Sequence, residues 1–174
     1  MLFPTLHTAR LSLRPFAAGD MGELLAYTAD PQAMAYVGGP LDETAARAFI
    51  ERNGDSAAEA AAVVLAAEGR LIGHLIFHPW FAPQTFEIGW VFHPQYCGRG
   101  YATEGAQALL AYGFERLGLH RIIATCQPEN PASARVMEKL GMRREGHFRQ
   151  CIQREGGVWW DAYFYAILSQ EWPG

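Results

Sequence analysis

Short apolar runs bounded by turn residues alternate along the chain with stretches whose apolar residues recur at helical spacing. The first pattern is typical of strands and the second of amphipathic helices. Strands are therefore expected at residues 11–14, 60–67, 71–77, 86–92, 121–125, 143–152 and 159–168. Helices are expected at residues 17–28, 42–52, 102–117 and 130–140, with one more helical turn between Asp30 and Gly38. Hairpins early and late, with a strand–helix–strand crossover between them, indicate a mixed α/β chain of the α+β class.

The helical spacing also predicts which side of two helices faces a core. Asp42 is a suitable N-cap for the second helix, whose inner side is expected to carry Ala45, Ala48 and Phe49. The helix at residues 102–117 is expected to bury five apolar side chains, namely Ala106, Leu109, Leu110, Phe114 and Leu117.

Length and composition limit the class of protein. The 174 residues, half of them hydrophobic, suit a single domain over residues 1–174 with a proper core. A net charge of -4 makes nucleic acid an unexpected partner. No apolar run reaches the length of a membrane span, and the N-terminus does not have the pattern of a signal peptide, so no membrane partner is expected. The cysteines Cys97, Cys126 and Cys151 have no metal-binding spacing, and reduced thiols in the cytoplasm are the expectation.

A metal site is not expected from the six histidines. His74 and His78 are the two that lie four apart, and both fall at a predicted strand. Four residues of strand span about 13 Å, which is too far for two ligands of one ion.

The most informative segment is the one from Gln95 to Gly100, which lies between a predicted strand and a predicted helix. Glycines at 98 and 100 allow close approach of a ligand to the backbone, and the following helix turns its unpaired N–H groups toward the loop. Such a junction is an anion site. It is not a P-loop, because no Gly-Lys-Ser/Thr follows, and it is not a dinucleotide loop, because Thr103 takes the place of the third glycine.

The spacing that remains, Gln-x-x-Gly-x-Gly, resembles the acyl-CoA pyrophosphate loop of the GNAT superfamily of N-acetyltransferases. Residues 8–15, 130–142 and 157–161 resemble, in the same order, segments of the branch that acetylates alanine or serine at ribosomal-protein N-termini. The resemblance implies the GNAT fold, a largely antiparallel central sheet of about seven strands flanked by about four helices. It also implies acetyl-CoA as the donor, with coenzyme A as the product.

The resemblance further implies where acetyl-CoA is bound. The pyrophosphate is expected on the backbone of the loop, with Gln95 and Arg99 at its rim, and the pantetheine beside the end of the preceding strand. The N–H of Val91 is a candidate for stabilising the oxyanion. The cofactor-binding residues implied are Val91, Phe92, Gln95, Cys97, Gly98, Arg99, Gly100, Tyr101, Ala102 and Asn130.

Two residues are candidates for catalysis. Glu87 stands on the strand before the loop, between apolar neighbours, and an apolar setting generally raises the pKa of a carboxyl group, as a base requires. A glutamate early on this strand is the base in several GNAT branches; a solvated glutamate or one paired with an arginine is the alternative. Asn130 and Pro131 suit the start of a helix without any ligand. In the resembling branch the asparagine contacts coenzyme A and Ser133 lies near the sulfur as a proton donor.

The acceptor is expected to be a primary amine, either a protein N-terminal α-amine such as that of a ribosomal protein, or a small molecule. The apolar loop at residues 79–83, with Trp80 and Phe81, could pack on its own domain, line an acceptor pocket or make a homodimer contact. Two alternatives remain open from the residues. One is a non-catalytic acyl-CoA sensor, and the other is a domain that binds a different nucleotide at the same loop.

Overall fold

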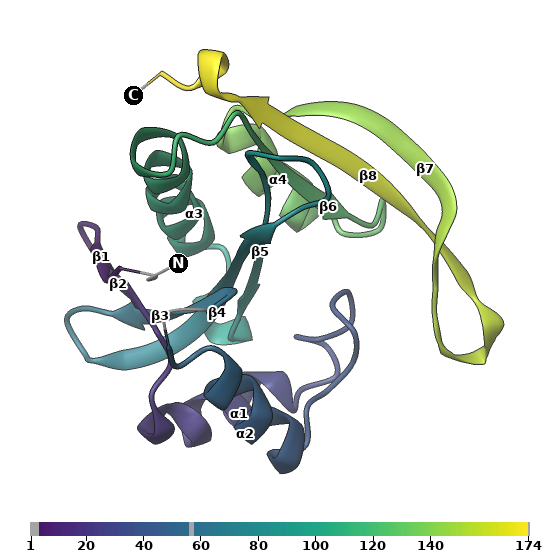
Figure 1. The fold of residues 1–174 in the computed structure, drawn as a ribbon. Coiled ribbons are helices and arrows are strands. Elements are labelled where there is room, and N and C mark those ends of the chain that lie inside the picture. The colour runs from purple at the N-terminus through teal and green to yellow at the C-terminus, as the bar shows by residue number, and fades with distance from the viewer. Residues whose placement is uncertain (1–3, 56–57, 174) are drawn as a thin grey trace. The chain divides into compact units, whose positions relative to one another are not determined.

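The computed structural model describes residues 4–55 and 58–173, and within them lie eight strands and four α-helices (Figure 1). The strands are β1 (Leu6–His7), β2 (Leu11–Arg14), β3 (Ala60–Leu65), β4 (Arg70–Pro79), β5 (Thr85–Phe92), β6 (Arg121–Cys126), β7 (Arg143–Gln153) and β8 (Trp159–Leu168). The helices are α1 (Met21–Thr28), α2 (Glu43–Arg52), α3 (Tyr101–Ala111) and α4 (Pro131–Lys139).

The strands form one sheet in the order β1-β2-β3-β4-β5-β6-β8-β7. The pairs β1–β2, β2–β3, β3–β4, β6–β8 and β7–β8 are antiparallel, and β5 pairs with β6 in parallel. This mixed sheet of mostly antiparallel strands, with four helices in the described residues, confirms the expected fold class. The sheet has one strand more than expected, namely β1, which pairs with β2. Its two residues are too few to form an apolar run, so the sequence pattern did not predict a strand there.

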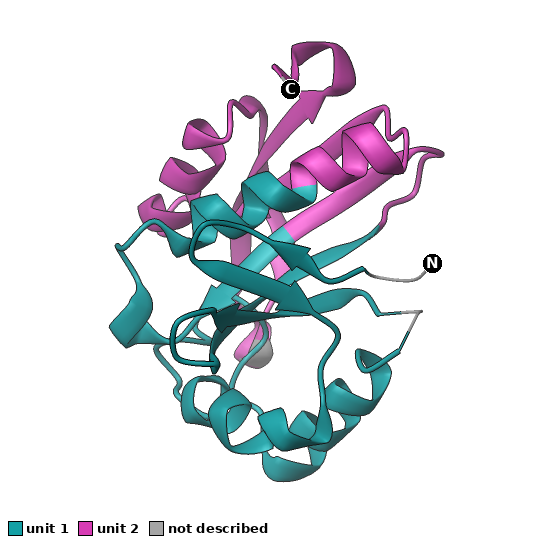
Figure 2. Cartoon of the chain, turned by 90° about the vertical axis from the view of Figure 1, so that its left-hand side faces the viewer, with its two compact units in different colours: residues 1–78, 89–109 teal, residues 79–88, 110–174 magenta. Residues whose placement is uncertain are grey.

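The chain divides into two compact units, shown in different colours in Figure 2. Unit 1 consists of Met1–His78 and Gly89–Leu109, and unit 2 of Pro79–Ile88 and Leu110–Gly174. The strand β5 contributes its first residues to unit 2 and its last residues to unit 1. The predicted single domain over residues 1–174 stays a prediction.

In unit 1 the register places helices on both faces of the strands. Leu11 and Leu13 of β2 share a face with Leu75 of β4, and Gly105 of α3 lies so close to these three side chains that a Cβ there would touch them. On the other face, a buried cluster joins β3 and β4 to α1 and α2; its largest members are Phe16, Leu24, Tyr27, Met34, Ile50 and Leu71. Burial on both faces explains why β3 is apolar without alternation.

The predicted inner side of α2 was right for Phe49, which packs against the buried cluster, and wrong for the two alanines. Ala46 and Ile50 are buried, whereas Ala45 and Ala48 are exposed. Because α2 has an alanine at three of its positions, small apolar residues lie on more than one side of the helix, and the larger Ile50 decides which side packs. The start was predicted correctly, since the Asp42 carboxylate accepts a hydrogen bond of 2.8 Å from the N–H of Ala45.

The predicted helix at residues 102–117 has a shorter α-helical part. Ala106, Leu109 and Leu110 are fully buried as expected. From Tyr112 to Arg116 the backbone continues as a π-helix, and Phe114 and Leu117 beyond α3 are half-buried. A one-residue change in hydrogen-bond spacing leaves no mark in an apolar pattern, so the sequence could not show it.

A polar pair lies in the core of unit 1. The hydroxyl of Tyr27 is 2.8 Å from Nδ1 of His74, and the Phe49 ring centroid is 5.1 Å from that of the imidazole. Burial raises the pKa of Tyr27 and lowers the pKa of His74 to about 4. A protonated phenol and a neutral imidazole satisfy each other with one hydrogen bond, which lets both be buried.

In unit 2 one helix covers one face of the strands. Tyr165 of β8 donates a hydrogen bond of 3.3 Å to Glu138 of α4, and a Cβ on Gly141, just after α4, would lie 3.8 Å from Ile167. The helix begins at Asn130, whose Oδ1 accepts from the N–H of Ser133 at 3.1 Å, with Pro131 as the first helical residue. The expected N-cap is therefore confirmed.

We expect the buried His74 to make the stability of the protein depend on pH. Its folded-state pKa of about 4 lies below the value of about 6.5 for an unfolded chain, so the unfolded state binds the proton first as pH falls. About 3 kcal/mol of stability should be present above pH 6.5 and be lost progressively down to pH 4. Thermal unfolding of His74→Gln between these pH values should show a flatter profile than the parent. The exposed His120→Gln is the control, and the same slope in all three proteins would contradict this account.

The cap of α4 gives a second prediction. Asn130→Ala leaves the N–H of Ser133 without its side-chain acceptor and should lower the free energy of unfolding by about 1 kcal/mol. Asn130→Ser should recover most of this loss, because serine caps nearly as well as asparagine. Urea unfolding of the three proteins measures both differences, and equal stability of all three would show that the cap contributes nothing.

Candidate active site

The predicted anion loop is exposed and has the backbone shape that only glycine adopts easily. After β5, a short 3-10 turn covers Pro94–Tyr96, and α3 starts at Tyr101. Gly98 and Gly100 have φ angles of +74° and +82°, in the left-handed region. All residues from 97 to 100 are exposed. The loop thus brings exposed backbone to the N-terminal end of an 11-residue helix, which favours an anion there.

The two glycines differ in their surroundings. A Cβ on Gly98 would have no atom within 4 Å, so its requirement comes from the φ angle and from whatever approaches the loop from outside. A Cβ on Gly100 would lie 3.5 Å from Nη2 of Arg10. Open space at Gly98 is what a loop that receives a ligand on its backbone requires.

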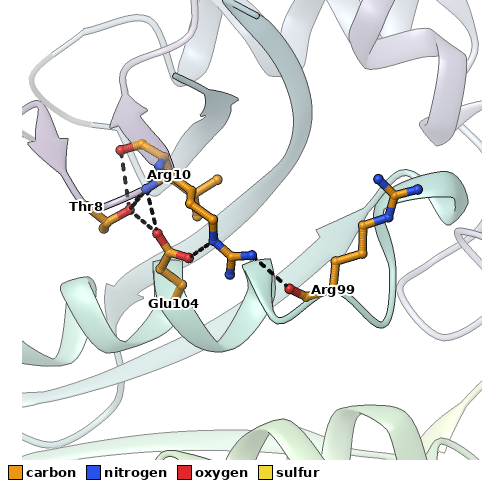
Figure 3. A network of polar contacts seen from close by, with 5 residues as sticks. Thr8, Arg10, Arg99 and Glu104 are labelled. Carbon is orange, nitrogen blue, oxygen red and sulfur yellow. Dashed lines mark hydrogen bonds and ion pairs between the residues drawn. The ribbon is translucent and has the colours of Figure 1, made fainter. Parts of the chain in front are cut away.

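A polar network in unit 1 lies against the start of α3 and was not foreseen from the sequence (Figure 3). Glu104 of α3 accepts hydrogen bonds from the Thr8 hydroxyl at 2.6 Å and from Nε of Arg10 at 2.6 Å. Nη1 of Arg10 donates to the carbonyl of Arg99 at 3.2 Å. Partial burial raises the pKa of Glu104, but the bonds from Thr8 and Arg10 outweigh it and hold the pKa below its usual value. Arg10 and Glu104 are 94 positions apart, so no local sequence pattern predicts that they pair.

The end of β5 can offer a ligand only its backbone. The side chains of Val91 and Phe92 are both buried. Gly73 of β4 lies so close that a Cβ there would stand 2.5 Å from the carbonyl oxygen of Val91. The expected contacts of these two residues would therefore be made by main-chain groups.

Cys97 has a thiol that is held in the protonated form. Its Sγ is 3.7 Å from the carbonyl oxygen of His93, and partial burial raises the pKa of the thiol. A protonated thiol is a poor nucleophile. The expected backbone contact of Cys97 meets a difficulty, because its N–H donates to the carbonyl of Pro94 at 3.1 Å. Gln95 is exposed, and its N–H donates to Nδ1 of His93 at 3.2 Å.

In unit 2, Glu87 lies at the last residue pair between β5 and β6. It pairs with Ile123, so its side chain is on the same face as Ile123 and Thr125. Glu87 is half-buried as a whole residue, and its Oε1 accepts a hydrogen bond of 3.3 Å from the hydroxyl of Thr125. Thr125 is a neighbour that the sequence reasoning did not single out.

Aromatic side chains lie on the same face of unit 2. Thr125 pairs with Phe164 of β8, and the ring of Phe164 is 5.4 Å from Trp80 and 5.5 Å from Phe148 between centroids. Trp80 packs on the buried cluster of Ile123, Phe164 and Ala166, whereas Phe81 beside it is 82% exposed. The apolar loop at residues 79–83 thus has one aromatic ring on its own unit and one in solvent.

The other candidates of unit 2 have contacts of their own. Asn130 uses Oδ1 for the cap, and its amide nitrogen is the part of the side chain that can donate to a ligand. Ser133 is half-buried in the first turn of α4. Glu145 is paired with Arg121, which lowers the pKa of that carboxyl, and Asp161 lies 2.7 Å from Nε2 of His147.

The loop belongs to unit 1, whereas Asn130 and Ser133 belong to unit 2. Among residues 4–55 and 58–173, no three His, Cys, Asp or Glu side chains gather as metal ligands. None of the helices in the described part of the chain is long and apolar enough to span a membrane.

Comparison with known proteins identifies the family of this chain. Residues 10–143 match the family described as the acetyltransferase (GNAT) domain. The chain is 51% identical over 166 residues to the uncharacterized N-acetyltransferase YnaD of Bacillus subtilis, with 95% of this chain and 97% of that protein covered. The crystal structure of a GNAT-family acetyltransferase from Bacillus anthracis has a TM-score of 0.91 and 48% identity, and covers 96% of this chain and 99% of that one.

More distant relatives have names that describe their reactions. The FsC-acetyl coenzyme A-N(2)-transacetylase of Aspergillus fumigatus is 31% identical over 183 residues, covering 97% of this chain and 78% of that protein. Two proteins named as ribosomal acetyltransferases, one from Bacillus subtilis and one from Escherichia coli, match about half of the chain at 32% and 27% identity. The predicted family is confirmed: the chain belongs to the GNAT family of N-acetyltransferases.

Proposed function

We propose that the protein transfers the acetyl group of acetyl-CoA directly to a primary amine in the cytoplasm. The observation that carries the proposal is the exposed loop at Gly98 and Gly100, with its left-handed glycines at the start of α3. The charge of acetyl-CoA is concentrated on its phosphates, and backbone N–H groups at a helix N-terminus bind phosphate well. Bound acetyl-CoA supplies a thioester, whose carbonyl carbon is already reactive toward an amine.

The loop residues would act mainly through their backbone. The N–H groups from Gly98 to Ala102, including those of Arg99, Gly100 and Tyr101, would receive the pyrophosphate, with Gln95 and Arg99 at the rim. The N–H of Cys97, which was also expected there, donates to the carbonyl of Pro94. Val91 and Phe92 would line the pantetheine with main-chain groups, since their side chains are buried. The N–H of Val91 would stabilise negative charge on the thioester oxygen. Asn130 would add a contact through its amide nitrogen.

Glu87 is proposed as the general base. The amine must be neutral to attack, and an α-amine with a pKa near 8 loses its proton to a modest base at neutral pH. The nitrogen then bonds to the carbonyl carbon, the carbon–sulfur bond breaks, and the thiolate takes up a proton. Ser133 is the proposed donor of that proton. The hydroxyl of Thr125, bonded to Glu87, would hold the carboxylate in one orientation.

The acceptor is proposed as a protein N-terminal α-amine, including that of a ribosomal protein, or a small-molecule amine. Relatives named for two different acceptors support the reaction class without choosing between them. The aromatic side chains near Glu87 on the same face, Phe148 and Phe164 among them, support an acceptor with apolar groups beside the amine.

Binding of acetyl-CoA, with ATP and NAD as competitors, tests the proposal first. Calorimetry of the parent protein should give binding at micromolar strength that neither nucleotide reproduces. Mass spectrometry of a panel of peptides and small amines incubated with acetyl-CoA then identifies the acceptor. Tight binding without transfer to any amine would favour an acyl-CoA sensor, and equal binding of ATP would favour a nucleotide domain.

Gly98→Ala should weaken acetyl-CoA binding by tenfold or more, on the order of 1.4 kcal/mol. A Cβ there meets no protein atom, so its effect would come from blocking the ligand and from the φ of +74°. Gly69→Ala is the matched control, because Gly69 has a φ of +63° and equally open space, but lies in a hairpin turn. Titration calorimetry compares the two. Equal affinity of both variants would remove the loop from the binding site.

Glu87→Gln should lower kcat by about 100-fold while leaving the affinity for acetyl-CoA near that of the parent. The amide keeps the size of the side chain and can still accept from Thr125, but it cannot take a proton. Glu115→Gln, in the same unit, is the control for loss of a carboxylate. Steady-state rates over a pH series provide the measurement, and a parental rate and pH profile for Glu87→Gln would exclude it as the base.

A further inference from the structure

We propose that Arg10 is a positioning residue that, held by Glu104, sets the direction of the Gly100 N–H in the acetyl-CoA loop. The inference rests on the proposed function, because it concerns how the loop receives acetyl-CoA. Arg10 belongs to the network of Thr8, Arg10 and Glu104 (Figure 3), and all three residues lie in unit 1.

The guanidinium of Arg10 is fixed at three points. Its Nε donates to Oε2 of Glu104 at 2.6 Å, and its Nη1 donates to the Arg99 carbonyl at 3.2 Å. Its Cζ lies 4.5 Å from the ring centroid of Tyr101, a cation–π distance. The planar fork of arginine can make these contacts at the same time, whereas a lysine ammonium lacks the spread-out donors to reach them together.

Glu104 is itself held in place by further hydrogen bonds. Its Oε1 accepts from the Thr8 hydroxyl at 2.6 Å and from the backbone N–H of Arg10 at 2.9 Å. Its own N–H donates to the carbonyl of Gly100 at 3.0 Å, in the first turn of α3. The carboxylate therefore joins the segment before β2 to the helix that begins at the loop.

The contact with Arg99 controls a donor of the loop. In a trans peptide the C=O and the following N–H point in opposite directions within one plane. When Arg10 binds the carbonyl of Arg99, the N–H of Gly100 is turned away from Arg10. Gly100, with φ of +82°, allows this orientation without strain. Arg10 thus fixes one N–H donor of the proposed pyrophosphate site without itself binding the ligand.

Positioning and simple charge attraction predict opposite results for one substitution. Glu104→Gln removes a negative charge near the loop, so attraction alone would make an anionic ligand bind more tightly. If Glu104 holds Arg10 in place, the same substitution frees the guanidinium, because the amide has one accepting oxygen in place of two. The loop then loses its fixed N–H, and acetyl-CoA binds more weakly.

The test measures acetyl-CoA binding by calorimetry and kcat for the parent, Glu104→Gln and Arg10→Lys. Both variants should bind acetyl-CoA about tenfold more weakly, the effect expected from losing one hydrogen bond to a charged group. Their kcat at saturating acetyl-CoA should equal that of the parent. Because a lost orientation is not an effect of charge, the fold-change should be the same at low and at physiological salt.

The exposed pair of Arg47 and Glu43 on α2 provides the matched control. Glu43→Gln makes the same change of charge in the same unit and should leave acetyl-CoA affinity at the parental value. Thermal unfolding shows whether Glu104→Gln still folds. If it does not, the acetyl-CoA affinity of Arg10→Lys alone tests the inference.

Each outcome has one meaning. Unchanged or tighter binding by Glu104→Gln, or unchanged binding by Arg10→Lys, would overturn the inference and leave the proposed function intact. A lower melting temperature with parental affinity would also overturn it, since the network would then only stabilise the fold. A parent that does not bind acetyl-CoA would overturn the proposed function, which is a distinct result.

Discussion

The exposure of backbone N–H groups between Gly98 and Ala102 is the constraint on which the loop of unit 1 depends. Backbone donors normally find partners within the fold, and a loop that keeps several of them for a ligand needs support from elsewhere. The left-handed glycines supply the shape, and the buried side chains of Val91 and Phe92 anchor the strand that leads into it. The network around Arg10 fixes the loop at its junction with α3.

Unit 2 solves a different problem, that of placing a carboxylate on a face that is otherwise apolar. Glu87 shares its face with Ile123 and Phe164, and Thr125 supplies a polar neighbour. Arg121, on the same face, forms an ion pair with Glu145. One face of the strands therefore carries both a carboxylate and aromatic rings. The helix α4 packs against the other face, where Tyr165 of β8 donates a hydrogen bond to Glu138 of α4.

Much of the fold could be predicted from the sequence because local signals and burial agree. The strands at 11–14 and 159–168 have the expected bounds, since turn residues flank each apolar run. On the inner side of α2, Phe49 was predicted correctly and Ala45 and Ala48 were not, because alanines carry little information on which side of a helix packs. At the candidate site, the left-handed backbone of the loop could be predicted from its glycines. The pairing of Glu104 was missed, because its partners lie far away in sequence and nothing local indicates them.

The long separation of those partners has a consequence for folding. Arg10 and Glu104 are 94 residues apart, whereas β7 and β8 are joined by a short turn and can pair as soon as both are made. Contacts that close long loops form late, because the entropy of closure must be overcome before any contact is gained. The hairpin of unit 2 should therefore appear early in refolding and the network behind the glycine loop late. Affinity for acetyl-CoA would then be acquired at the end of folding, which makes ligand binding a kinetic reporter of the completed unit 1.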